Sequence, residues 1–135
     1  MFLLDTNACI RILSDTSSRL VSRVRSHDRS EVFLCSVVKA ELLYGARKSA
    51  RVEANLVTLR RFFEPFSCLP FDDESAEHYG LIRSDLAKQG TPIGPQDLMI
   101  AAIARAHDAI LVTHNTKEFS RVRGLRFEDW EEDRH

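Results

Sequence analysis

Short apolar runs alternate with longer amphipathic segments along this chain of 135 residues. The short runs are typical of buried strands, because each is bounded by polar or turn residues and is too short for a helix. They occupy residues 2–4, 32–35, 66–69 and 110–113, and a weaker run at 125–127 suits a strand at the edge of a sheet. Between them, apolar residues recur at helical spacing. This spacing predicts helices at about 7–13, 17–27, 37–44, 51–62, 72–88 and 95–106, and a helical turn at 116–122.

The alternation of strands and helices predicts an α/β fold with a parallel sheet of four to five strands flanked by helices. Thr6 or Asn7 is the expected cap of the first helix, and Ser36 that of the third. The segment 98–106 is apolar almost all round, so its helix is expected at the centre of the molecule. No linker, repeat or low-complexity stretch interrupts the pattern, so residues 1–135 are expected to form one domain.

Composition and charge are those of an ordinary globular protein, with 44% hydrophobic residues, 29% charged residues and a formal net charge of −1. The charge is uneven, because residues 128–135 hold five of the 20 acidic residues and one of the 19 basic residues. The rest of the chain therefore has a small basic excess. Its basic residues, among them Lys39, Arg47 and Lys48, are candidate contacts for a phosphate backbone or simply a solvated helix surface.

Cysteine usage indicates a reducing compartment. The three cysteines are widely spaced and form no C-x-x-C pair, so we expect small buried side chains and neither a disulfide framework nor a zinc site. The first residues have neither a basic start nor a long apolar run, so no signal peptide is expected. No apolar stretch is long enough for a membrane span, and we expect a cytoplasmic protein with no membrane association.

Three acidic residues lie where the pattern predicts core or the start of a helix. Asp5 directly follows the run at 2–4, and Glu41 and Asp97 are expected in the first turns of two helices. Each has an ordinary explanation: a helix cap for Asp5, a solvent-facing side chain for Glu41, and an acid favoured by the helix dipole for Asp97. In a parallel sheet, however, positions that follow the strands share one edge, where ligands bind.

Polar residues also follow the late strand that ends at Thr113, namely His114, Asn115 and, one turn later, Glu118. Each of them alone suits an ordinary surface position. Several carboxylates at one edge repel one another unless they are protonated or neutralised by a cation. Oxygen ligands suit a hard cation such as Mg²⁺ or Mn²⁺, which commonly binds substrate phosphates, so the pattern indicates phosphodiester chemistry.

Four segments resemble, in order, the motifs of the PIN-domain ribonucleases, and in particular the VapC toxins of bacterial toxin–antitoxin pairs. The first is Leu4-Asp5-Thr6-Asn7, and the second is Val38-x-x-Glu41-Leu42-x-x-Gly45. The third covers residues 90–102 around Asp97, and the fourth covers residues 111–119, followed by Val122, Gly124-Leu125 and Glu128-Asp129-Trp130. Any one of these segments is weak evidence, whereas four in register are highly specific.

The resemblance implies an αβα sandwich with a mostly parallel sheet and a Mg²⁺- or Mn²⁺-dependent endoribonuclease site. Asp5, Glu41 and Asp97 correspond to the three central acids of the family and form the expected metal site, with Asp5 and Asp97 holding the ion and Glu41 binding the ion's water or acting as the base for the attacking water. The fourth position departs from the common aspartate, because it is Asn115 here. Glu118 is then the residue that supplies the missing charge.

The resemblance also implies partners. RNA, including transfer RNA, is the expected substrate, and a VapB-type antitoxin protein is the expected inhibitor. A homodimer is expected, with helices at about 37–62 supplying its face, and the antitoxin would build a larger hetero-oligomer on it.

Three alternatives remain open from the sequence. A haloacid dehalogenase type of enzyme also begins with a strand and an acid, but it needs a second aspartate where this chain has Asn7. A receiver-type signalling module needs a lysine that the segment Thr113-His114-Asn115 does not offer. A degenerate PIN domain that only binds RNA or protein would keep the fold, and Asn115 leaves that reading open.

Overall fold

Five parallel strands form the central sheet, in the order β3-β2-β1-β4-β5. The computed structural model describes residues 1–132, so the last three residues of the expected 1–135 domain lie outside it. The strands are β1 (Phe2–Leu4), β2 (Val32–Cys35), β3 (Ser67–Leu69), β4 (Ile110–Val112) and β5 (Phe127–Glu128). Strand β1 lies at the centre, with Phe2 opposite Val32 of β2 and Ile110 of β4. The expected sheet is confirmed, and it is parallel throughout.

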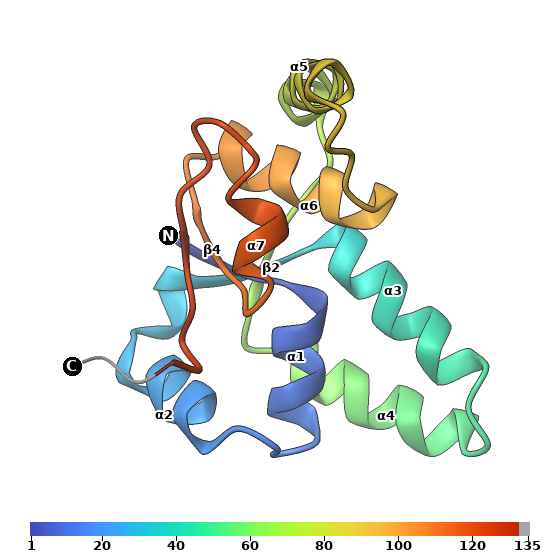
Figure 1. Cartoon of the computed structure of the whole chain (residues 1–135). Coiled ribbons are helices and arrows are strands. Elements are labelled where there is room, and N and C mark those ends of the chain that lie inside the picture. The colour runs from blue at the N-terminus through green and yellow to red at the C-terminus, as the bar shows by residue number, and fades with distance from the viewer. Residues whose placement is uncertain (133–135) are drawn as a thin grey trace.

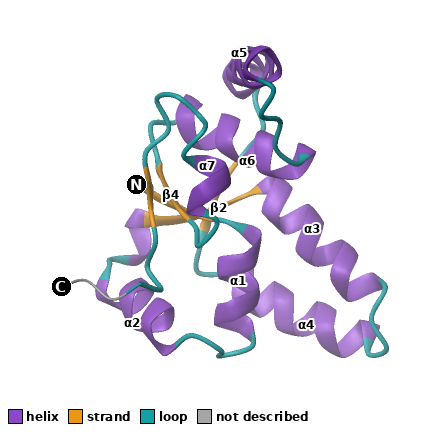
Figure 2. Ribbon diagram, in the orientation of Figure 1, coloured by secondary structure: helices purple, strands orange, loops and turns teal. Residues whose placement is uncertain are grey.

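Helices lie on both sides of the sheet, as Figures 1 and 2 show. Helices α5 and α6 pack together, while α3 packs against both α4 and α1. The α-helices are α1 (Thr6–Leu13), α2 (Ser18–Ser26), α3 (Ser36–Arg47), α4 (Val52–Phe63), α5 (Asp73–Gln89), α6 (Pro95–Ala106) and α7 (Thr116–Phe119), and a 3₁₀ turn covers Arg29–Glu31. None of the helices within residues 1–132 combines the length and the apolar character needed to cross a bilayer.

The core is centred on the helix that the sequence marks as apolar all round. Residues 100–104 of α6 are completely buried, as are Leu3, Leu4 and Leu111 of the neighbouring strands. Near the C-terminus, Trp130 is also buried, and its ring stacks on His27 with centroids 4.8 Å apart. The segment after β5 is therefore anchored to the sheet and to the end of α2.

The sequence pattern places most boundaries within two residues of those observed, and the strand at 32–35 is confirmed at both ends. Thr6, Asn7 and Ser36 were wrong as caps, because α1 is capped by Asp5 and α3 begins at Ser36 itself, after Cys35; the alternative expectation of a helix cap at Asp5 is confirmed. The last strand lies at Phe127–Glu128, not at 125–127.

Cysteine burial was predicted correctly at two positions. Cys9 and Cys35 are buried, but Cys68 is exposed, because it lies on β3 at the edge of the sheet. Its neighbour Ser67 on the same strand is exposed as well. All three thiols are free.

Candidate active site

Asp5 is the most buried of the acids at the carboxyl edge of the sheet, with only 4% of its surface exposed. It follows β1, and its backbone N–H donates to the Val112 carbonyl at the end of β4. Its Oδ1 accepts a 2.8 Å hydrogen bond from the Ala8 N–H, which caps α1. Burial raises the pKa of Asp5, while hydrogen bonds from the Thr113 side chain and the Ala8 N–H oppose that rise. Asp5 is therefore both a helix cap and a carboxylate held beside other acids.

Glu41 lies in the second turn of α3, not in the first turn as expected, because the helix begins at Ser36. Its Oε1 is buried and makes no hydrogen bond, and the same is true of the Thr6 hydroxyl oxygen. Burial raises the pKa of Glu41, and the nearby Thr6 hydroxyl favours the charged form without reaching good hydrogen-bond geometry. A buried carboxylate oxygen without a partner is costly, so a cation or a water is expected to bind it.

Asp97 lies in the first turn of α6, as expected, and Pro95 is the first residue of that helix. Burial and the neighbouring carboxylates Glu118, Asp5 and Glu41 raise its pKa to about 6. The helix dipole normally favours the charged form at this position, so burial and the neighbouring acids together outweigh it. Asp97 is the side chain on which the other three acids act.

Asn115 and Glu118 form a pair at the start of α7. The Asn115 side-chain amide donates a 2.7 Å hydrogen bond to Glu118 Oε2, and its backbone N–H donates to the Thr113 hydroxyl at 3.0 Å. Glu118 contributes the largest of the carboxylate effects on the pKa of Asp97. The negative charge that the sequence lacks at position 115 is therefore present one turn later.

The structure thus brings together the residues that the sequence singled out. Asp5 directly follows β1, while Glu41, Asp97 and Glu118 lie on α3, α6 and α7, and the other three acids all act on the pKa of Asp97. No three of these four carboxylates bring their oxygens within 4.8 Å of one another. Within residues 1–132, a different group of side chains has its metal-ligand atoms within 4.8 Å of one another. This group consists of His114, Asp129 and Glu131.

A cavity of about 530 Å³ leads away from these acids between α1, α3 and α4. Thr6, Glu41 and Gln96 line it close to the acids, and Tyr44 and Lys48 line it further along α3. The Lys48 ammonium lies 5.0 Å from the centre of the exposed Tyr44 ring. Lys48 therefore offers a positive charge beside the cavity, whereas Lys39 lies over the Phe63 ring and Arg47 is not among the lining residues.

Sequence reasoning missed several side chains at this edge. Thr6 and Gln96 adjoin recognised acids and were passed over as helix-start residues. Glu131 also acts on Asp5 and raises its pKa. The sequence signal for Glu131 was the group of acidic residues that follows the last strand. That strand ends at the same carboxyl edge of the sheet as β1 and β4.

Comparison with known proteins agrees with this geometry. Residues 2–125 match the family model described as the PIN domain. The "tRNA(fMet)-specific endonuclease VapC" of Shigella flexneri is 43% identical over 96% of this chain and 97% of its own length.

Solved structures give the same result. VapBC from Salmonella typhimurium, bound to DNA, matches with a TM-score of 0.90 and 40% identity, over 96% of this chain and 97% of that one. VapBC2 from Rickettsia felis, bound to a promoter DNA fragment, matches with a TM-score of 0.90 and 33% identity, over 96% and 98%. The haloacid dehalogenase and receiver alternatives are therefore excluded. The chain belongs to the PIN-domain family, among its VapC ribonucleases.

Proposed function

We propose that this chain is a divalent-metal-dependent endoribonuclease, the toxin of a toxin–antitoxin pair, with residues 1–135 as its single domain. The observation that carries the proposal is the convergence of Asp5, Glu41 and Glu118 on Asp97, because burial and these three carboxylates together raise the pKa of Asp97 to about 6. Acids are not crowded in this way for stability, because their mutual repulsion costs free energy.

The donor set fits Mg²⁺ or Mn²⁺. It consists of carboxylate oxygens, and Glu41 Oε1 is a buried oxygen that lacks a partner. The open spacing of the acids suits hard cations that keep several waters. When bound, such an ion acts as a Lewis acid towards the scissile phosphate and makes water more acidic.

The chain's own residues hold and orient the reacting groups. Asp5 is fixed by the Ala8 N–H and the Thr113 hydroxyl, and together with Asp97 it is the proposed anchor of the cation. Glu41, near Asp97, is the proposed base that accepts a proton from the attacking water. Asn115 orients Glu118 through its amide, so that Glu118 adds charge beside Asp97. In-line attack on the phosphodiester leaves a 5′-phosphate and a 3′-hydroxyl.

The proposed substrate is transfer RNA, and initiator transfer RNA is the first candidate. The Shigella flexneri relative is named as an endonuclease specific for that RNA. Lys48 beside the cavity is a proposed contact for the phosphate backbone. Single-stranded loops of a folded RNA expose the backbone to such a surface.

The proposed protein partner is a VapB-type antitoxin, because the structures of two relatives are described as VapBC assemblies on DNA. A homodimer is proposed as well, through α3 and α4, where Tyr44 and Val57 are exposed apolar side chains. The degenerate, binding-only alternative loses its main support, because Glu118 supplies charge beside Asn115.

The test is cleavage of purified transfer RNA by the wild-type protein, by Asp97→Asn, and by Asp85→Asn as a matched control on α5. Wild type and Asp85→Asn should cleave with Mg²⁺ or Mn²⁺ and stop with EDTA. Asp97→Asn should lose about 100-fold or more in rate, because residues that act as a unit fail together. Cleavage by Asp97→Asn at the wild-type rate would falsify the assignment. Mapping the RNA ends after brief expression in cells then identifies the target.

A further inference from the structure

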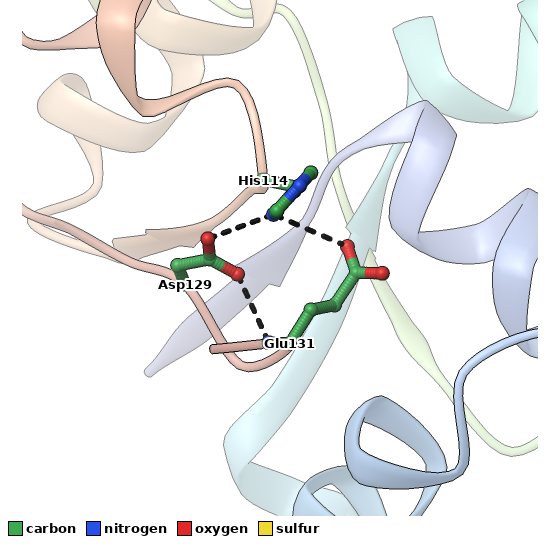
Figure 3. Close-up of side chains that lie close together, drawn as sticks. All are labelled: His114, Asp129 and Glu131. Carbon is green, nitrogen blue, oxygen red and sulfur yellow. Dashed lines mark hydrogen bonds and ion pairs between the residues drawn. The ribbon is translucent and has the colours of Figure 1, made fainter. Parts of the chain in front are cut away.

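A second group of metal-ligand side chains lies beside the acids described above. His114 comes two residues after β4, and Asp129 directly follows β5, the next strand of the sheet. Glu131 follows on the same segment, and Figure 3 shows its carboxylate and that of Asp129 on either side of the His114 ring. The two strands therefore deliver an imidazole and two carboxylates to one point.

The donor atoms are close enough to share one ion. His114 Nδ1 lies 2.8 Å from Asp129 Oδ2 and 4.0 Å from Glu131 Oε2, and the three donor atoms are all within 4.8 Å of one another. Ligands around a tetrahedral Zn²⁺ sit about 2.0–2.2 Å from the ion, which places them slightly over 3 Å apart. Small side-chain shifts bring the group to that spacing.

The protein holds the far oxygen of each carboxylate. Asp129 Oδ1 accepts a 2.9 Å hydrogen bond from the Glu131 N–H, and Glu131 Oε1 lies 3.4 Å from the Arg11 guanidinium. The other oxygen of each carboxylate faces His114. Outer partners of this kind orient the ligands of metal sites, and mutating them commonly weakens binding.

We propose that His114, Asp129 and Glu131 form a Zn²⁺ site, distinct from the central acids. One nitrogen and two carboxylate oxygens suit a borderline ion such as Zn²⁺, whereas the all-oxygen central acids suit Mg²⁺ or Mn²⁺. The two carboxylate charges exceed the single charge of Arg11, so the site attracts a cation. The His114 side chain is 52% exposed, which leaves room for a water as the fourth ligand.

Zinc at this site ties the turn after β4 to the segment after β5. That segment carries Trp130, whose ring is buried against His27 and Phe2. Binding to the folded state alone raises its stability by mass action. The site does not depend on the proposed nuclease activity.

The test is titration of the full-length, chelator-stripped protein with Zn²⁺, and with Co²⁺ as an absorbing probe, in excess Mg²⁺. Wild type should bind one equivalent of Zn²⁺, show tetrahedral Co²⁺ absorption and unfold at a higher temperature with Zn²⁺. His114→Asn should bind Zn²⁺ about 100-fold more weakly.

Two further variants separate this site from others. His107→Gln is the matched control, because His107 faces a single carboxylate, that of Asp72 at 3.4 Å, and it should bind Zn²⁺ as wild type does. Asp97→Asn should also keep its Zn²⁺. Equal Zn²⁺ binding by His114→Asn and wild type overturns the proposal, and so does loss of Zn²⁺ in Asp97→Asn. Asp129→Asn provides a second ligand variant, and undiminished Zn²⁺ binding by it counts against the site equally.

Discussion

The Asn115 amide donates a 2.7 Å hydrogen bond to Glu118 Oε2, so the neutral residue at the fourth position orients a charged one. The Glu118 carboxylate in turn raises the pKa of Asp97. The negative charge at this corner of the site therefore comes from Glu118, and Asn115 orients it. The hydrogen bond also fixes the position of the Glu118 side chain, whereas the side chain of an isolated surface glutamate would not be fixed.

Replacing Glu118 with glutamine should keep the size of the side chain and remove its charge. We expect RNA cleavage to fall about 10- to 100-fold and the Mg²⁺ concentration for half-maximal cleavage to rise, because the site loses part of its attraction for the cation. Mg²⁺ titrations of wild type, Glu118→Gln and the exposed control Glu77→Gln measure both effects. An unchanged Mg²⁺ midpoint in Glu118→Gln would exclude Glu118 from the site.

Asp97→Asn should stabilise the metal-free protein at alkaline pH. The raised pKa of Asp97 means that the folded state holds this proton more tightly than the unfolded chain does. The contribution of Asp97 to the free energy of unfolding is therefore highest when the pH is below 3.8, the ordinary pKa of an aspartate. It falls as the pH rises through about 6. Asparagine carries no charge at any pH, so the gain in stability of Asp97→Asn over wild type should be greatest above about pH 6.

Thermal unfolding in EDTA measures this effect. At pH 8 we expect Asp97→Asn to unfold about 3 °C above wild type, a modest gain because Asp97 is half-buried and partly screened. At pH 5 the difference should shrink. A difference that grows as pH falls would contradict the crowding of acids around Asp97.

Thr113→Val should loosen Asp5. Thr113 is buried, its side chain hydrogen-bonds to Asp5 and so lowers the pKa of Asp5, and its hydroxyl accepts from the Asn115 N–H. Without the hydroxyl, the pKa of Asp5 should rise further and cleavage should fall about 10-fold at neutral pH. The pH profile of cleavage should shift to higher pH, and Thr113→Ser should restore it. A lower rate with an unshifted profile would indicate only a packing defect.

Lys48→Glu should weaken RNA binding through charge, since Lys48 lines the cavity beside the central acids. We expect a lower kcat/KM with little change in kcat, and a salt dependence of RNA binding whose slope falls by about 1. Lys88→Glu, an exposed lysine near the end of α5, is the matched control. Equal losses in both variants would mean that net charge, and not Lys48, governs binding.

The pattern of apolar residues was sufficient for the sheet and for the helices, because burial imposes their periodicity directly. Asp5 and Asp97 were found for the same reason: a charge beside a buried strand or at the start of an apolar helix breaks the pattern. Glu41 was wrongly expected in the first turn of α3, although both the predicted start at 37 and the observed start at Ser36 place it in the second turn.

Contacts between side chains distant in sequence were harder to foresee. The hydrogen bond between Asn115 and Glu118 depends on a rotamer, and the effect of Glu131 on Asp5 depends on how the last segment turns after β5. Cys68 was misjudged because β3 was not recognised as an edge strand. The periodicity of apolar residues indicates which face of a helix or strand is buried, but it does not indicate which side chains from other elements contact that face.

The sheet order has a consequence for the moment at which this molecule acquires activity. Its central strand, β1, precedes the other four strands in the sequence, yet its neighbour β4 and the acid Glu118 follow more than 100 residues later. A nascent chain that ends before residue 110 lacks one whole flank of β1. Such a fragment should fail to cleave RNA when purified, so the ribosome that translates the chain is not exposed to a finished nuclease until β4 and Glu118 have been synthesised.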